Sequence, residues 1–243
     1  MWQKFLHVWR LKDIRTSIVF VLAMLVIFRI AAHIPVPGIN VQNLEAFLNG
    51  NQVLGLLNIF SGGTLENFSI VMLGVAPYIT ASIIFQLLQM VVPRLEELQK
   101  EGQSGQAKIQ MYTRIASVPL ALLQSYGLIQ LLRQSPLQIL PELSSFEYAS
   151  IMLTTTAGTV FLMWLGELIT EKRLGNGMSM LIFAGIIAAL PQAVQGAFLN
   201  YTPSLLYSYI GFLLIALITI VAVVFMQEGQ RQIPVHYAKR LIG

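Results

Sequence analysis

Residues 205–226 read L-L-Y-S-Y-I-G-F-L-L-I-A-L-I-T-I-V-A-V-V-F-M, without one charged side chain. A helix needs about 20 mostly apolar residues to cross the hydrocarbon core of a bilayer. The stretch therefore predicts a membrane-spanning helix. The composition of the whole chain agrees, because 56% of its residues are hydrophobic and only 11% are charged, where a soluble domain carries roughly 25% charged residues.

Five further apolar stretches qualify or nearly qualify as spans. The first follows four basic residues and no cleavage-site pattern comes after it, so we interpret it as a retained span rather than a signal peptide. The sequence thus predicts an all-α, polytopic integral membrane helix bundle (residues 16–226) between a cytosolic N-terminal segment (1–15) and a cytosolic loop that starts at 227 and runs to 243. The six predicted spans are 16–32, 70–92, 112–132, 148–165, 178–190 and 205–226.

Lysines and arginines set the orientation through the positive-inside rule. With the N-terminus in the cytosol, thirteen of the fifteen fall in cytosolic segments, and the reversed topology would place those thirteen outside. Arg133 alone lies outside, and Arg29 lies within the first span near its outer end. There it can anchor the helix at the interface or donate a hydrogen bond inside the bundle. The basic excess therefore faces the inner leaflet and cytosolic partners rather than nucleic acid.

The sequence offers little chemistry to an enzyme. It has no cysteine, and its three histidines lie far apart, outside the predicted spans. No H-E-x-x-H, P-loop or G-x-S-x-G motif occurs. No acidic residue lies in the middle of a span, which disfavours a proton-coupled carrier or an intramembrane hydrolase. We predict no catalysis, no metal and no cofactor, and expect either a passive path lined by apolar side chains or a structural bundle.

Two segments depart from a simple row of spans. Gln52 to Phe60 is mostly apolar, but as a helix it would rise only about 14 Å. It is too short to cross, so the pattern leaves open an interfacial helix or a re-entrant helix buried in protein. The fifth span is also short, between G-N-G (175–177) and Pro191, and such spans often line cavities. Pro77, inside the second span, is expected to produce an ordinary kink.

Five motifs follow one another along the chain. They are L-L-N-I-F-S-G-G-T-L (56–65), G-V-A-P-Y-I-T-A-S-I-I-F-Q-L-L (74–88), K-E-G-Q-S-G-Q-A-K (100–108) with Y-T-R (112–114), F-L-M-W-L-G-E-L-I-T-E (161–171) with G-N-G-M-S (175–179), and E-G-Q-R-Q-I-P-V-H-Y-A-K-R (228–240). Together they closely resemble the SecY family, the central subunits of the protein-conducting Sec translocon. The resemblance covers nearly the whole chain, as helices one to six of that family.

The resemblance implies a role for the short helix and a pore ring. Residues 52–60 would form a re-entrant plug that fills the outer funnel of a closed pore. A ring of aliphatic side chains would form the constriction, with Met178 standing where a branched side chain is commoner; Met is flexible enough to seal. The plug residues are Val53, Leu54, Leu56, Leu57, Ile59, Phe60 and the hinge Gly62 and Gly63, and the ring residues are Val75, Ile79, Met178 and Ile182.

Two further sites follow from the same resemblance. A lateral gate, through which apolar segments reach lipid, would include Thr80, Ile83 and Gln86 of the second span. Contacts with cytosolic partners would fall on the loop after the sixth span, and the basic residues expected there are Arg231, Lys239 and Arg240.

The implied function is a protein-conducting channel that moves unfolded secretory polypeptides across the bacterial cell (inner) membrane, and apolar segments into it. SecE and SecG would be its membrane partners, and SecA or the ribosome would dock on the cytosolic loops. Because such channels have two halves of five helices, we expect this chain to be an N-terminal part. The alternatives are a non-conducting structural or assembly membrane protein and a small-solute carrier, although a carrier needs polar groups at mid-depth and the spans offer few.

Overall fold

The structure, a computed structural model, describes residues 12–229 except 38, 40, 137–138, 141–142 and 200–201. Within this part the chain is helical, with one isolated antiparallel bridge between Pro35 and Ser69. The helices in chain order are α2 (Lys12–Ala32), α3 (Val41–Gly50), α4 (Gln52–Ser61), α5 (Ala76–Val91), α6 (Pro93–Lys100), α7 (Gln103–Arg133), α8 (Ser145–Glu171), α9 (Gly177–Leu199), the short 3-10 helix η1 (Pro203–Leu205) and α10 (Leu206–Glu228).

Among the described residues, five helices are long and apolar enough to cross a membrane. The number becomes six if α5 and α6, which meet at a bend of 100°, form one broken span. This agrees with the predicted all-α polytopic membrane bundle. Only helices that satisfy their own backbone hydrogen bonds can cross hydrocarbon in this way, so the chain is a multi-pass membrane protein.

The second predicted span differs from the structure at its start. Residues 70–75 form turns, and the helix begins at Ala76 with Pro77 in its first turn. Proline lacks an N–H and its φ suits the first helical turn, so Pro77 starts α5 rather than kinking it. The preceding chain is tied to the segment that follows α2, because the Ile70 N–H donates to the Ile34 carbonyl at 3.0 Å.

The fifth predicted span also differs, at its end. The sequence suggested a stop before Pro191, but α9 continues through this proline to Leu199. Membrane helices tolerate an internal proline because neighbouring groups and local backbone adjustments satisfy the freed carbonyl. The chain divides at this point into two compact units, one up to Pro191 and one from Gln192. In the second unit, the Tyr209 hydroxyl donates to the Ala197 carbonyl at 3.4 Å.

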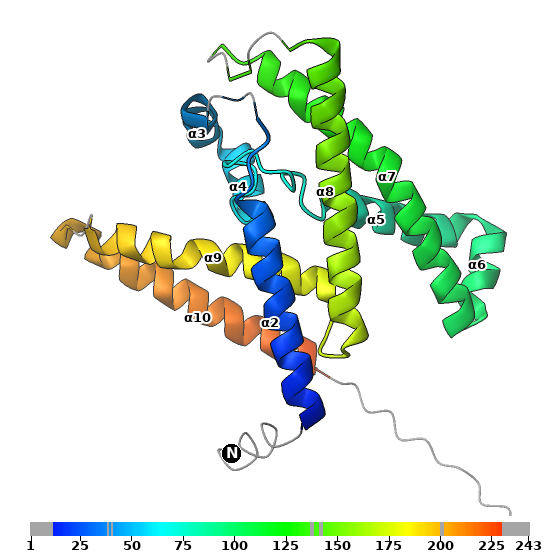
Figure 1. Cartoon of the computed structure of the whole chain (residues 1–243). Coiled ribbons are helices and arrows are strands. Elements are labelled where there is room, and N and C mark those ends of the chain that lie inside the picture. The colour runs from blue at the N-terminus through cyan, green and yellow to red at the C-terminus, as the bar shows by residue number, and fades with distance from the viewer. Residues whose placement is uncertain are drawn as a thin grey trace, which may run out of the picture. The chain divides into compact units, whose positions relative to one another are not determined.

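The first unit has two clusters of buried apolar side chains. One gathers Phe28 of α2, Leu162 of α8 and Leu181 of α9. The other joins Leu44 of α3 and Ile129 of α7 to the connector between α4 and α5. Helices α7 and α8 pack on each other and run in opposite directions, with α5 and α6 against α7 (Figure 1). These contacts bring α5, α7 and α8 together around the site described next.

Candidate functional site

An apolar cavity of about 490 Å³ lies in the first unit. Side chains of α2, α4, α5, α7, α8 and α9 and of the connector before α5 contribute to its wall. Two polar side chains, Ser61 and Gln124, stand among many apolar ones, and no charged side chain lines it. Water bound to such a surface makes few hydrogen bonds, so the cavity is poorly suited to hold ions.

The cavity brings together three of the four residues predicted for the ring. Val75 and Ile79 line it from the start of α5, and Ile182 lines it from α9. Met178 is buried, but it packs on α8, where its Sδ lies only 2.6 Å from the position a Cβ on Gly166 would take. Because Gly166 has no side chain, it makes room for the Met178 thioether away from the cavity. The four-residue ring itself stays a prediction.

Helix α4 contains the apolar residues predicted to form the plug. Leu54 lines the cavity, whereas Val53, Leu56 and Ile59 are exposed, Val53 by 67%. The side chains of Leu57 and Phe60 lie outside the part of the chain that the structure describes. The described contact of α4 with the cavity is therefore made by one leucine near its start and by Ser61 at its end.

The glycine pair predicted as a hinge ends α4. Gly62 and Gly63 both have φ of +78°, a left-handed conformation that other residues rarely adopt. The Gly63 N–H donates to the Asn58 carbonyl at 2.9 Å, and the Gly62 N–H to the Ile59 carbonyl at 3.0 Å. This pair of bonds satisfies carbonyls that a helix end otherwise leaves open, so the glycines stop the helix and turn the chain at once.

Polar side chains around this hinge were not predicted from the sequence. Asn58 Nδ2 donates to Glu66 Oε2 at 3.0 Å, and Asn58 Oδ1 accepts from the Glu66 backbone N–H at 3.0 Å. Arg29 Nη1 of α2 donates to the Gly62 carbonyl at 2.8 Å. Of the two roles that the sequence left open for Arg29, this bond favours that of a hydrogen-bond donor inside the bundle. Its partner lies 33 residues away, and a lone charge within an apolar span was the available signal.

The three residues predicted for a lateral gate lie on α5. The Thr80 hydroxyl donates to the Ala76 carbonyl at 3.0 Å and accepts from Gln124 Nε2 of α7 at 3.5 Å. Ile83 is 50% exposed, and the exposed Gln86 amide donates to the Ser82 hydroxyl at 3.5 Å. This places the predicted gate residues partly at the surface, as lipid-facing candidates, while Gln124, which sequence reasoning missed, ties α5 to α7.

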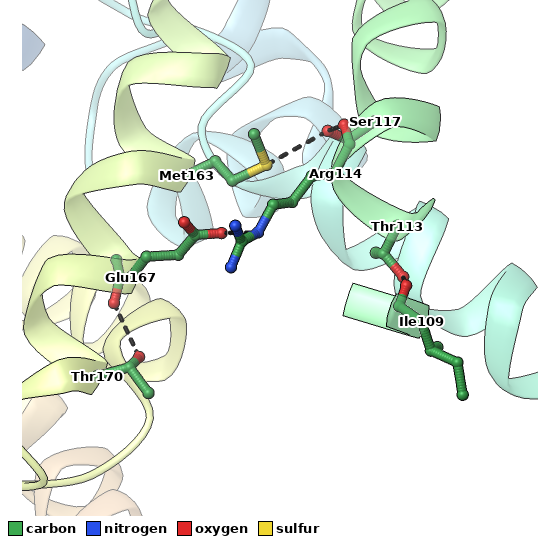
Figure 2. A network of polar contacts seen from close by, with 8 residues as sticks. Ile109, Thr113, Arg114, Ser117, Met163, Glu167 and Thr170 are labelled. Carbon is green, nitrogen blue, oxygen red and sulfur yellow. Dashed lines mark hydrogen bonds and ion pairs between the residues drawn. The ribbon is translucent and has the colours of Figure 1, made fainter. Parts of the chain in front are cut away.

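An ion pair joins α7 to α8 far from the hinge. Figure 2 shows the Arg114 guanidinium directed at the Glu167 carboxylate, with which it forms the pair. Beside it the Ser117 hydroxyl donates to the Met163 thioether at 3.4 Å. The two side chains of the pair are 43% and 25% exposed, so this end of the helix pair is polar and partly open to solvent.

Other charges lie on α6 and around the start of α7. Lys100 Nζ pairs with Glu96 at 2.7 Å, and Lys108 with Glu101 at 3.4 Å. The hydrogen bond and charge of Lys100 hold the pKa of Glu96 below its ordinary value. Within the described residues, no group of three or more histidines or carboxylates could hold a metal ion. The residues predicted to contact cytosolic partners, Arg231, Lys239 and Arg240, lie outside the described part.

Comparison with known proteins adds independent information. The family model described as SecY matches residues 69–242. Proteins named "Protein translocase subunit SecY" are similar to this chain: that of Streptomyces galbus is 45% identical, covering 98% of this chain and 58% of that protein. The one from Corynebacterium glutamicum is 46% identical, over 95% of this chain and 54% of that protein.

A third relative with the same name, from Mycobacterium tuberculosis, is 42% identical over 100% of this chain and 57% of its own length. The chain therefore spans a little over half the length of these curated relatives. The family model matches most of the chain, and relatives at this level of identity cover nearly all of it. The chain therefore belongs to the SecY family.

Proposed function

We propose that this chain contributes the first six helices of a protein-conducting channel, placed in the bacterial cell membrane with its N-terminus in the cytosol. The channel would move unfolded secretory polypeptides outward and release apolar segments sideways into lipid. The observation that carries the proposal is the apolar cavity, because Val75, Ile79 and Ile182 line it together with Leu54 of the short helix.

A resting channel of this kind has to hold back ions and water. Charged or backbone-lined walls would bind water, whereas a narrow collar of apolar side chains empties of water and closes the path to ions. Isoleucine side chains from α5 and α9 would supply part of the collar, and α4 would close it as the plug. A passing polypeptide then separates flexible side chains and needs no chemical reaction, so the proposed role is that of a channel subunit and not an enzyme.

The proposed partners follow from the same role. SecE and SecG would cover the bundle in the membrane, and SecA or the ribosome would bind the cytosolic loops and drive transport with nucleotide. Lys100 and Lys108 already pair with carboxylates of their own segment. We therefore place the basic contacts with a cytosolic partner on Arg231, Lys239 and Arg240.

The cavity also bears on the carrier alternative. A carrier that binds a small polar solute needs several hydrogen-bonding groups around it. Ser61 and Gln124 are the polar side chains on the wall, and Gln124 already donates to Thr80. This arrangement favours a path for apolar and extended chains over a specific solute site.

The test measures resting ion conductance across a planar bilayer, in a complete SecY-family channel that carries this sequence. Deleting Leu54–Phe60 should raise the conductance, and so should the double variant Ile79→Ser with Ile182→Ser. The control is Ile84→Ser with Ile187→Ser, which removes exposed isoleucines from the same two helices. Unchanged conductance in both the deletion and the ring variant would reject the proposal.

A further inference from the structure

The hydrogen bond between Arg29 and Gly62 is placed where a cation stabilises a helix end. Gly62 caps the C-terminus of α4, and its carbonyl accepts from Arg29 Nη1 at 2.8 Å. The C-terminus of a helix carries partial negative charge, and hydrogen bonds from charged donors are stronger than neutral ones. Arg29 takes part in no ion pair within the described residues, so this carbonyl is the partner that the structure gives to its charge.

A backbone contact with α9 also holds the C-terminal end of α4. A Cβ built on Gly62 would lie 2.7 Å from the Gly185 Cα, and one built on Gly185 would lie 3.1 Å from the Gly62 Cα. The two backbones therefore touch, which is possible because neither residue has a side chain. The end of α4 is thus held by α2 on one side and by α9 on another.

One face of α4 is open, although Leu54 packs on the apolar cluster around Leu44 and Leu48. Val53 is 67% exposed and Leu56 57% exposed, while Gly62 is buried. From this contrast we infer that Arg29 is a positioning residue for the plug, and that release of its bond to Gly62 is the step that lets α4 leave the cavity. The inference rests on the proposed function and adds to it the residue that sets the resting position.

The chemistry of the contact suits a bond that has to open. When it breaks, the Gly62 carbonyl is left as a neutral acceptor, and one charge remains to be hydrated. Arg29 lies in the last turn of α2, where a long side chain can turn its guanidinium towards the interface. Opening this bond therefore leaves one charge without a partner, whereas opening an ion pair would leave two.

The direct test measures the distance between two spin labels by pulsed electron resonance. The chain has no native cysteine, so labels can be placed at Val53→Cys on α4 and Leu123→Cys on α7, both exposed. In reconstituted protein, Arg29→Met should broaden the distance distribution and raise the displaced fraction by about tenfold or more, the loss expected for a charge-assisted bond. Arg29→Lys, which keeps a charged donor, should restore most of the narrow distribution.

Two controls separate positioning from a general loss of structure. Arg133→Met removes an exposed arginine from the end of α7 and should leave the distribution unchanged. Gly185→Ala keeps Arg29 but pushes the Gly62 backbone away, so it should also displace α4, and it serves if Arg29→Met fails to fold. A folded Arg29→Met variant that keeps the narrow, wild-type distribution would overturn the inference, and if that variant does not fold, a narrow distribution in Gly185→Ala would do so.

Conductance of the complete channel distinguishes this inference from the proposed function. If deleting the plug raises conductance and Arg29→Met does not, Arg29 does not hold the plug and the channel assignment stands. If neither the plug deletion nor the ring variant changes the conductance, the proposed function fails, and the spin-label distances still decide whether Arg29 holds α4. Raised conductance in both variants, with recovery in Arg29→Lys, supports the inference.

Discussion

Arg29 and Arg114 each hold two segments of the first unit together, but they bind different kinds of partner. Each is an arginine on an apolar helix, and each reaches across to another segment of the first unit. Arg114 meets the carboxylate of Glu167, a second charge on a neighbouring long helix. Arg29 meets the neutral carbonyl at the end of α4, a short helix with one exposed face.

The difference separates a permanent contact from one that can open. Opening an ion pair leaves two charges to be solvated, which is costly where the pair is partly buried. Opening an arginine–carbonyl bond leaves only one charge to be solvated. We therefore expect the Arg114–Glu167 pair to determine stability, and the Arg29 contact to determine where α4 rests.

The largest effect on stability should come from breaking the ion pair on one side. Arg114→Met should lower the free energy of unfolding by about 1–3 kcal/mol, a range reduced because Arg114 is 43% exposed. The double variant with Glu167→Leu should recover most of this loss, since no charge stays unpaired. Unfolding in mixed detergent micelles measures both, and an Arg114→Met variant as stable as the wild type would break the comparison.

A smaller effect is expected from the side-chain pair beside the hinge. Asn58→Leu removes two hydrogen bonds to Glu66, which should cost about 1–2 kcal/mol in local opening. Faster hydrogen exchange at the Glu66 amide would report it. Glu66→Gln keeps an acceptor oxygen and the backbone donor, so it is the matched control and should exchange nearly as slowly as the wild type. Equal protection in Asn58→Leu would mean that this pair does not hold the hinge.

The smallest effect should come from the exposed pair on α6. The pKa of Glu96 is lowered by Lys100, so any stability from this pair is present above the unfolded pKa and fades as pH falls through the folded pKa. Both side chains are more than half exposed, and such pairs contribute little. Glu96→Gln should therefore leave the Tm unchanged at neutral and acidic pH. A measurable drop in Tm at neutral pH would contradict the expectation that an exposed ion pair contributes less than a partly buried one.

The fold class followed from composition, but its details did not. An uncharged run such as 205–226 has few alternatives to a membrane helix, and α10 covers it. The predicted start of the second span at Ile70 was wrong as a helix start. Hydropathy measures how long an apolar stretch is, but it does not show which backbone conformation that stretch adopts. Pro77 carried the missing signal, since proline favours the first turn of a helix.

Spacing along a helix did not decide which of the predicted ring residues line the cavity. Ile79 and Ile182 line one cavity, as the motif positions suggested. Met178 shares the i, i+4 spacing with Ile182, yet its side chain fills the space that Gly166 leaves on α8. Contacts such as Arg29 with Gly62 join segments far apart in sequence, and neither periodicity nor composition identifies which of them meet.

The bend between α5 and α6 has a consequence for the surrounding lipid. Helix α5 has 16 residues and rises about 24 Å, less than the roughly 30 Å of a bilayer's hydrocarbon core. Its neighbour α7, with 31 residues, is far longer than that core. A short apolar belt favours local thinning of the bilayer. If the proposed lateral gate lies along α5, a polypeptide leaving there would cross less hydrocarbon than along α7, and membrane thickness would become part of the gate.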